Sequence, residues 1–149
     1  MSGLEDLYQE LILDHSKRPH GKGLLGAEDD PHTAESHQRN PICGDEITLR
    51  AQVSDDGERI TEVSWEGSGC SISQASASML TELVVGQTRA EAAVLIDGFR
   101  EALRSRGAIE LDEDVYGDAA ALTGVSRYVA RVKCAMLGWV ALEDALLRA

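Results

Sequence analysis

Residues 47–65 read ITLRAQVSDDGERITEVSW, and they contain two runs of alternating side chains separated by a polar break. In the first run, residues 47–53, every second side chain is apolar, which is typical of a half-buried strand. The same period resumes at Thr61, Val63 and Trp65. The intervening residues 54–58, SDDGE, have the composition of a turn. We therefore predict an antiparallel hairpin over residues 46–66.

Helical patterns lie on both sides of this hairpin. Before it, apolar residues spaced three and four apart predict an amphipathic helix, and these residues are Leu4, Leu7, Tyr8, Leu11 and Ile12. Ser2 and Glu5 have capping-box spacing at its start. The polar segment between about residue 20 and residue 40 is expected to form a loop or an irregular edge strand.

Three helices are predicted after the hairpin. The first begins near Ser71 and ends at Gly86, and the second begins at Thr88, with Glu91 three residues later as a capping box. The last spans about residues 128–147. Residues 105–124 are rich in glycine and acidic side chains, so we expect a connection there with a short helical turn at 118–122.

This order of elements predicts an α+β fold for residues 1–149, which we expect to form a single domain. A short antiparallel sheet of about three strands would be covered on one face by helices, and the chain would end in a long C-terminal helix. A parallel, doubly wound sheet is disfavoured because strands and helices do not alternate along the chain.

The net charge argues against several classes of function. With 26 acidic and 14 basic side chains, the chain carries a net charge of −12, which phosphate backbones repel. We therefore expect no nucleic-acid partner. No apolar stretch approaches the length of roughly 20 residues that spans a bilayer, so no membrane association is expected. The N-terminal residues lack the pattern of a secretion signal, and a cytoplasmic location is expected.

The three cysteines, Cys43, Cys70 and Cys134, lie where the predicted backbone changes character. Cys43 is in a loop before the first hairpin strand, Cys70 lies between a strand and a helix start, and Cys134 is early in the last helix. An odd number of cysteines argues against a disulfide framework. It leaves buried thiols, a metal site or a reactive thiol.

Asp45 adds a carboxylate two residues after Cys43. In extended backbone the two side chains point to the same side, and thiolate and carboxylate groups are both ligands of Zn²⁺. Three cysteines and one aspartate would complete a tetrahedral set. Arg131 and Lys133 lie three residues and one residue before Cys134 and could offset the negative charge of such a site. Spacing alone leaves open three unrelated buried thiols, because no CxxC pair is present.

Several segments together resemble the family of iron–sulfur cluster assembly scaffolds, which includes IscU and the NifU N-terminal domain. These segments are 7–15 (LYQELILDH), 40–45 (NPICGD), 67–73 (GSGCSIS), 75–79 (ASASM) and 131–139 (RVKCAMLGW). Within the family, the chain looks like the zinc-dependent SufU branch. The IscU branch carries histidine before its third cysteine, where this chain has Lys133. The acidic 105–124 segment also resembles the insertion that distinguishes SufU.

The resemblance implies zinc bound by Cys43, Asp45, Cys70 and Cys134. It also implies a zinc-dependent sulfurtransferase in which Cys43 accepts persulfide sulfur from a SufS-type, pyridoxal-phosphate cysteine desulfurase, with Arg131 assisting. A downstream Suf assembly complex would receive the sulfur. Two alternatives remain: a non-catalytic scaffold that assembles a transient iron–sulfur cluster on the same cysteines, and a structural zinc domain. Asp45 could instead brace its loop.

The remaining candidates are given ordinary structural roles. The histidines are expected at the surface or in loops, since none has metal-pair spacing with a cysteine, and they are His15, His20, His32 and His37. The two tryptophans are expected in the core. The serine-rich run 71–78 is interpreted as close packing of small side chains.

Overall fold

The computed structural model describes residues 3–25, 31–41 and 44–149. Its elements, in chain order, are α1 (Gly3–Lys17), β1 (Thr33–Asn40), β2 (Asp45–Val53), β3 (Ile60–Ser68), α2 (Ser71–Val84), α3 (Arg89–Arg104), α4 (Glu113–Tyr116), the 3₁₀ helix η1 (Gly117–Arg127) and α5 (Val129–Arg148). The order helix, sheet, helices confirms the predicted α+β class, with a long C-terminal helix. None of the described helices is long and apolar enough to cross a bilayer.

The three strands form one antiparallel sheet in the order β1-β2-β3. The predicted hairpin is confirmed, with Leu49 opposite Trp65 and Ala51 opposite Val63. These four side chains are buried because the two-residue period places them all on one face. The free edge of β3 is covered by the segment after α1, whose Gly21 and Gly23 exchange backbone hydrogen bonds with Trp65. Covering an edge in this way protects it from pairing with another chain.

β1 is more regular than its sequence suggested. The segment TAESHQRN pairs with β2 without interruption from Thr33 opposite Gln52 to Asn40 opposite Asp45. Its inward positions carry small or polar side chains, such as Ala34 and Ser36, so its hydrophobic period is weak. The pairing with β2 determines its conformation, in keeping with the strong context dependence of strand propensity.

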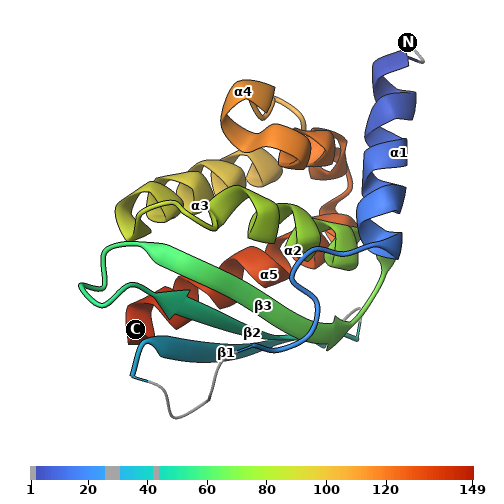
Figure 1. Cartoon of the computed structure of the whole chain (residues 1–149). Helices are drawn as coiled ribbons and strands as arrows, with labels where there is room; N and C mark the ends of the chain where they lie inside the picture. Colours follow the sequence, from blue (N-terminus) through green and yellow to red (C-terminus); the bar gives the residue numbers. More distant parts are fainter. Residues whose placement is uncertain (1–2, 26–30, 42–43) are drawn as a thin grey trace.

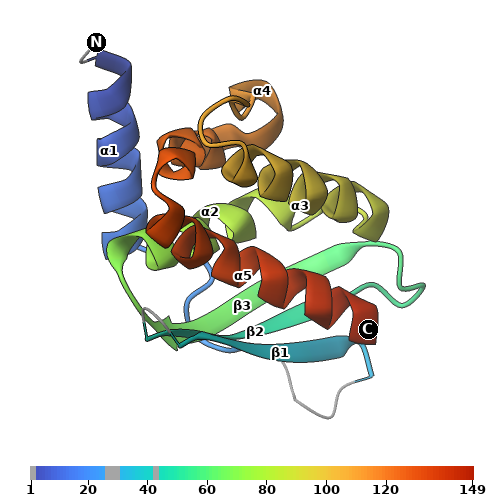
Figure 2. The ribbon, with the colours of Figure 1, turned by 180° about the vertical axis from the view of Figure 1, so that it is seen from behind.

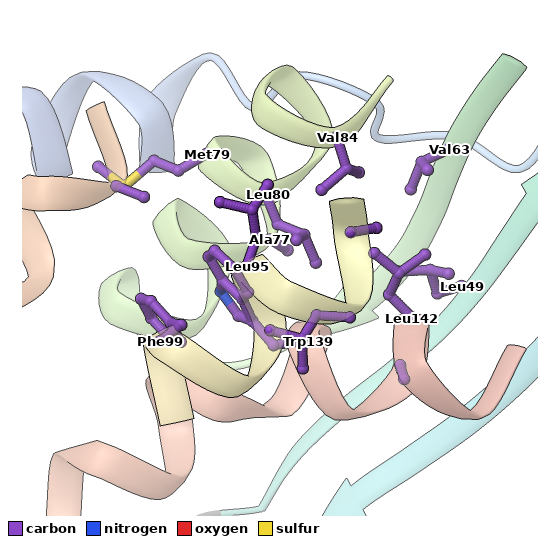
Figure 3. Close-up of a cluster of buried hydrophobic side chains, with 14 of the residues drawn as sticks. Leu49, Val63, Ala77, Met79, Leu80, Val84, Leu95, Phe99, Trp139 and Leu142 are labelled. Atoms are coloured by element: carbon purple, nitrogen blue, oxygen red, sulfur yellow. The ribbon is translucent and has the colours of Figure 1, made fainter. Parts of the chain in front are cut away.

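Helices cover one face of the sheet, as predicted. α5 packs on β1 and β2, while α2 packs on β3 and beside α5 (Figure 1, and from behind in Figure 2). α3 and α4 lie beyond these two helices, farther from the sheet. α1 packs along α2 at one end of the molecule. The buried apolar side chains fill the space between the sheet and the helices and also between the helices; in the close-up of Figure 3, Leu49 and Val63 come from the sheet, whereas Met79 and Phe99 lie among the helices.

The boundaries of the later helices agree with those predicted from the sequence, except in one region. The capping box of Thr88 and Glu91 starts α3, and α5 begins one residue after its predicted start. Residues 113–127, however, are almost entirely helical, through α4 and η1, where only a short turn at 118–122 was expected. The reason is burial, because η1 packs residues 119–122 and Val125 against neighbouring helices.

The serine-rich start of α2 packs closely against α5. Ser73, Ser76 and Ser78 are buried, and Ser76 Oγ donates a hydrogen bond to the Ala135 carbonyl at 2.6 Å. A Cβ added to Gly138 would touch Ala77 at 3.4 Å. Small side chains therefore let the two helices approach each other, which is the role the sequence suggested for this run.

Gly67→Ala is expected to lower the free energy of unfolding by about 1–3 kcal/mol, the usual cost of overpacking. Gly67 lies opposite Ile47 in the sheet, and a Cβ there would collide with the Glu46 carbonyl oxygen, which belongs to the backbone and cannot rotate away. Urea denaturation measures the effect. Gly124→Ala is the control, because its Cβ would meet nothing within 4 Å; its change should stay within about 0.5 kcal/mol. Equal losses in both variants would contradict the prediction.

Candidate metal centre

Asp45 is the first residue of β2, and its side chain is only 2% exposed. Its Oδ1 accepts a hydrogen bond from the backbone N–H of Cys70 at 3.1 Å, which ties the start of β2 to the start of α2. The turn between β3 and α2 reaches Asp45 because residue 69 is glycine. A Cβ there would lie 2.7 Å from Asp45 Oδ1 and would also collide with Ser73 Oγ.

Cys70 is the N-cap residue of α2, and its backbone is extended there. The strand–helix junction turns its side chain toward Asp45, so that the thiol Sγ lies 3.8 Å from Asp45 Oδ2. The same sulfur lies 4.0 Å from Ser73 Oγ. Cys70 is half-buried, whereas Ser71 beside it is exposed.

Cys134 joins this pair from the second turn of α5, where it is buried. One ligand atom each from Asp45, Cys70 and Cys134 lies within 4.8 Å of the other two. Three separate elements, β2, the N terminus of α2 and α5, therefore bring a carboxylate and two sulfurs to one point. In the sequence, the position of each residue at a backbone junction allowed such a meeting, and three unrelated buried thiols were the alternative.

Cys43 lies outside the described residues. The described residues before and after it are joined to each other. The Gly44 N–H donates a hydrogen bond to the Asn40 carbonyl at 2.8 Å, and Asn40 pairs with Asp45 between β1 and β2. The ends of the β1–β2 connection are therefore held next to Asp45.

The donor set fits a divalent cation. Among residues 3–25, 31–41 and 44–149, no lysine, arginine or histidine forms an ion pair with the buried Asp45 carboxylate. Buried carboxylates are normally paired with a cation or coordinate a metal. Two sulfurs and a carboxylate oxygen are ligands that Zn²⁺ takes in tetrahedral sites. The same thiols also suit iron–sulfur chemistry.

Arg131 and Lys133 do not join the three donors. Both side chains are exposed, and within the described part of the chain neither forms a hydrogen bond or ion pair with Asp45, Cys70 or Cys134. Arg131 instead lines a cavity of about 320 Å³, together with residues of α1, α2 and η1 that include Tyr8, Ile72 and Arg127. Both basic side chains therefore lie at the surface and outside the donor cluster.

One expectation about the histidines was wrong. His15 was expected at the surface or in a loop, but it lies on α1 and is 4% exposed. It makes hydrogen bonds with Ser78 and Asp118. The sequence did contain a signal for this position: His15 follows Leu11 by four residues and so lies on the apolar face of the predicted helix.

The sequence matches the family of NifU-like N-terminal domains over residues 7–145. It is 38% identical to the iron–sulfur cluster assembly scaffold protein IscU of Streptococcus pyogenes serotype M1, over 99% of this chain and 87% of that protein. It is also 38% identical to the zinc-dependent sulfurtransferase SufU of Bacillus subtilis (strain 168), over 99% of this chain and 94% of that protein.

Among solved structures, FiSufU from Fervidobacterium islandicum AW-1 aligns with a TM-score of 0.75 at 36% identity, over 97% of this chain and 99% of that chain. The IscU and SufU relatives are equally similar in sequence, so overall identity does not separate a scaffold role from a sulfur-transfer role. The matched family covers both, and the chain belongs to the NifU-like N-terminal domain family of iron–sulfur cluster assembly proteins.

Proposed function

We propose that this chain is a zinc-dependent sulfurtransferase that accepts persulfide sulfur on Cys43 from a SufS-type cysteine desulfurase. The observation that carries the proposal is the convergence of the buried Asp45 carboxylate with the sulfurs of Cys70 and Cys134. Cys43 would be the fourth ligand, since two residues of chain reach at most about 7 Å and Cys43 is two residues from Asp45. The name of the Bacillus subtilis relative, a zinc-dependent sulfurtransferase, supports the choice of metal and activity.

Bound zinc would keep the ligand thiols deprotonated and protected from oxidation until the partner docks. The chain's own residues would position the ligands. Asp45 and Cys70 share a hydrogen bond that joins β2 to α2, so both donors are held in place before the partner arrives. Cys134 is fixed by the packing of α5 against the sheet. Pro41 and Gly44, which lie on either side of Cys43 in the chain, are both exposed, so Cys43 would be the ligand best suited to leave.

The transfer itself is thiol–persulfide exchange. The Cys43 thiolate attacks the outer sulfur of the desulfurase persulfide, a new sulfur–sulfur bond forms, and the old one breaks. The electron pair of the broken bond leaves with the desulfurase cysteine as a thiolate. No oxidant or reductant is consumed, because one persulfide replaces another. A downstream Suf assembly complex would then take the sulfur from Cys43.

Arg131 would assist from the surface. Arg131 lines the cavity beside α1, one helical turn before Cys134, so it could contact a docking partner without touching the ligands. Its proposed role is to orient the incoming desulfurase near Cys43.

The test is cysteine-dependent sulfide production by the desulfurase in the presence of reductant, with and without the zinc-loaded chain. The wild-type chain should stimulate the rate strongly, and Cys43→Ala should return it to the rate of the desulfurase alone. A thermal melt of the variant must show that it remains folded. No stimulation by fully zinc-loaded wild-type chain, or equal stimulation by Cys43→Ala, would refute the proposal.

A scaffold role is the second candidate, because the IscU relative from Streptococcus pyogenes is as similar as SufU. The same donor cluster would then receive an iron–sulfur cluster as its cargo. Lys133, where the IscU branch carries histidine, disfavours this role. Anaerobic reconstitution with iron and sulfide distinguishes the two: a stable cluster, together with no stimulation of the desulfurase, would favour the scaffold.

A further inference from the structure

A second group of potential metal ligands lies where the C-terminal end of α1 meets α2. One ligand atom each from His15, His20 and Glu82 lies within 4.8 Å of the other two. His15 ends the buried face of α1, His20 follows in the next segment, and Glu82 is in the last turn of α2. The two imidazole rings are 5.3 Å apart, measured between their centroids.

The buried His15 ring is held on both sides. Its Nε2 lies 2.9 Å from Asp118 Oδ2 on η1, and its Nδ1 lies 2.7 Å from Ser78 Oγ on α2. A carboxylate oxygen can only accept, so Nε2 must carry the proton and donate it to Asp118. In the neutral ring, Nδ1 is then the nitrogen whose lone pair can accept a hydrogen bond or bind a metal. The Ser78 hydroxyl donates to that lone pair and accepts the backbone N–H of His20 at 2.8 Å.

His15 Nδ1 contacts Ser78 on the face of α2 that also carries Glu82. Ser78 and Glu82 are four residues apart and so lie on the same face of this helix. Glu82 Oε2 is already 3.0 Å from His20 Nε2, and both side chains are about half exposed, at 47% and 56%. An ion can therefore reach this position from solvent, with the buried imidazole behind it.

We propose that His15 Nδ1, His20 Nε2 and Glu82 Oε2 form a second metal site, which takes a borderline divalent cation such as Zn²⁺ or Co²⁺. Two imidazoles and one carboxylate are a common protein ligand set for these ions, and water completes the coordination. Asp118 supplies the carboxylate that typically holds a metal-ligating histidine by its other nitrogen. Binding would replace the Ser78 hydrogen bond to Nδ1 and release any proton shared between His20 and Glu82.

This site is separate from the cysteine cluster. Cys70 caps the start of α2, and Glu82 lies twelve residues later, about 18 Å along the helix at 1.5 Å per residue. A bound ion would connect α1 and the segment after it to α2, and through Asp118 to η1. It takes no part in the proposed sulfur transfer.

The experiment is calorimetric titration of the full-length chain with Co²⁺ after its cysteine site has been filled with zinc and excess metal removed. The wild-type chain should bind one further equivalent. His20→Ala and Glu82→Ala should abolish that binding, and Asp118→Ala should weaken it by about 10–100-fold, as loss of an outer-shell partner does. The bound cobalt should show weak visible bands without thiolate charge-transfer absorbance, which would instead report exchange at the cysteine site.

The chain provides a matched control in a second histidine–carboxylate pair. His37 Nε2 lies 2.8 Å from Glu46 Oε2, and these side chains are also about half exposed, but no second imidazole joins them in any described segment. His37→Ala should therefore leave the further equivalent unchanged. The proposal is overturned if wild-type chain binds no further cobalt, if His20→Ala binds it as tightly, or if His37→Ala loses it equally. None of these results depends on whether Cys43 accepts sulfur.

Discussion

Trp139→Ala is expected to lower the free energy of unfolding by about 3–5 kcal/mol, the range seen when a large aromatic side chain is removed from a core. Trp139 is fully buried on α5 and stacks on Phe99 of α3, with ring centroids 3.8 Å apart and planes 4° apart. Its indole N–H also donates to Ser76 Oγ on α2 at 2.9 Å. This one side chain therefore contacts both other helices, α2 and α3, from α5. Figure 3 shows its position in the core.

Urea denaturation of the metal-free chain measures this loss without any contribution from bound zinc. Trp139→Phe is the informative control, because it retains much of the apolar contact with Phe99 but removes the donor to Ser76. Its loss should be smaller than that of Trp139→Ala. If the alanine variant is destabilised by less than about 1 kcal/mol, the core must be able to collapse around the site, and the stack would not be a principal support of α5.

Most of the fold could be predicted from the sequence because its periodic segments agree with their tertiary environment. The β2–β3 hairpin alternates strictly, and α3 begins at a capping box that the structure contains. β1 and η1 were harder to predict for opposite reasons. β1 buries small and polar side chains, so pairing rather than hydrophobic period determines it. In η1 a run of buried alanines lies within an acidic, glycine-containing segment whose average composition resembles a loop.

The site could be predicted only in part, since sequence position determines the backbone but not the reach of a side chain. Asp45, Cys70 and Cys134 lie at junctions of elements, and such junctions meet at one end of this sheet. Arg131 is near Cys134 along the helix, yet it lines the cavity beside α1 and, in the described part of the chain, forms no hydrogen bond or ion pair with the three donors. His15 and Glu82 are 67 residues apart in sequence, and only the packing of α1 on α2 brings them together.

Asp45→Asn and Cys134→Ser are expected to lower the zinc affinity by more than the roughly 10–100-fold that loss of an outer-shell partner costs, because each removes a proposed ligand. Asp45→Asn distinguishes a role of Asp45 as a zinc ligand from a role in bracing its loop. The amide oxygen can still accept the backbone N–H of Cys70, as Asp45 Oδ1 does, so the junction of β2 and α2 should persist. The negative charge that would bind zinc is lost. Competition with a chromophoric chelator under anaerobic conditions measures the affinity.

Glu46→Gln is the matched control for charge, because it removes a neighbouring carboxylate that is exposed and paired with His37. Its zinc affinity should equal that of the wild-type chain, so a drop confined to Asp45→Asn would identify a ligand rather than a general effect of negative charge. If Asp45→Asn binds zinc as tightly as wild type while Cys134→Ser does not, the role of Asp45 is to brace its loop. The fourth ligand would then have to come from elsewhere, since Cys43, Cys70 and Cys134 supply only three of the four positions of a tetrahedral site.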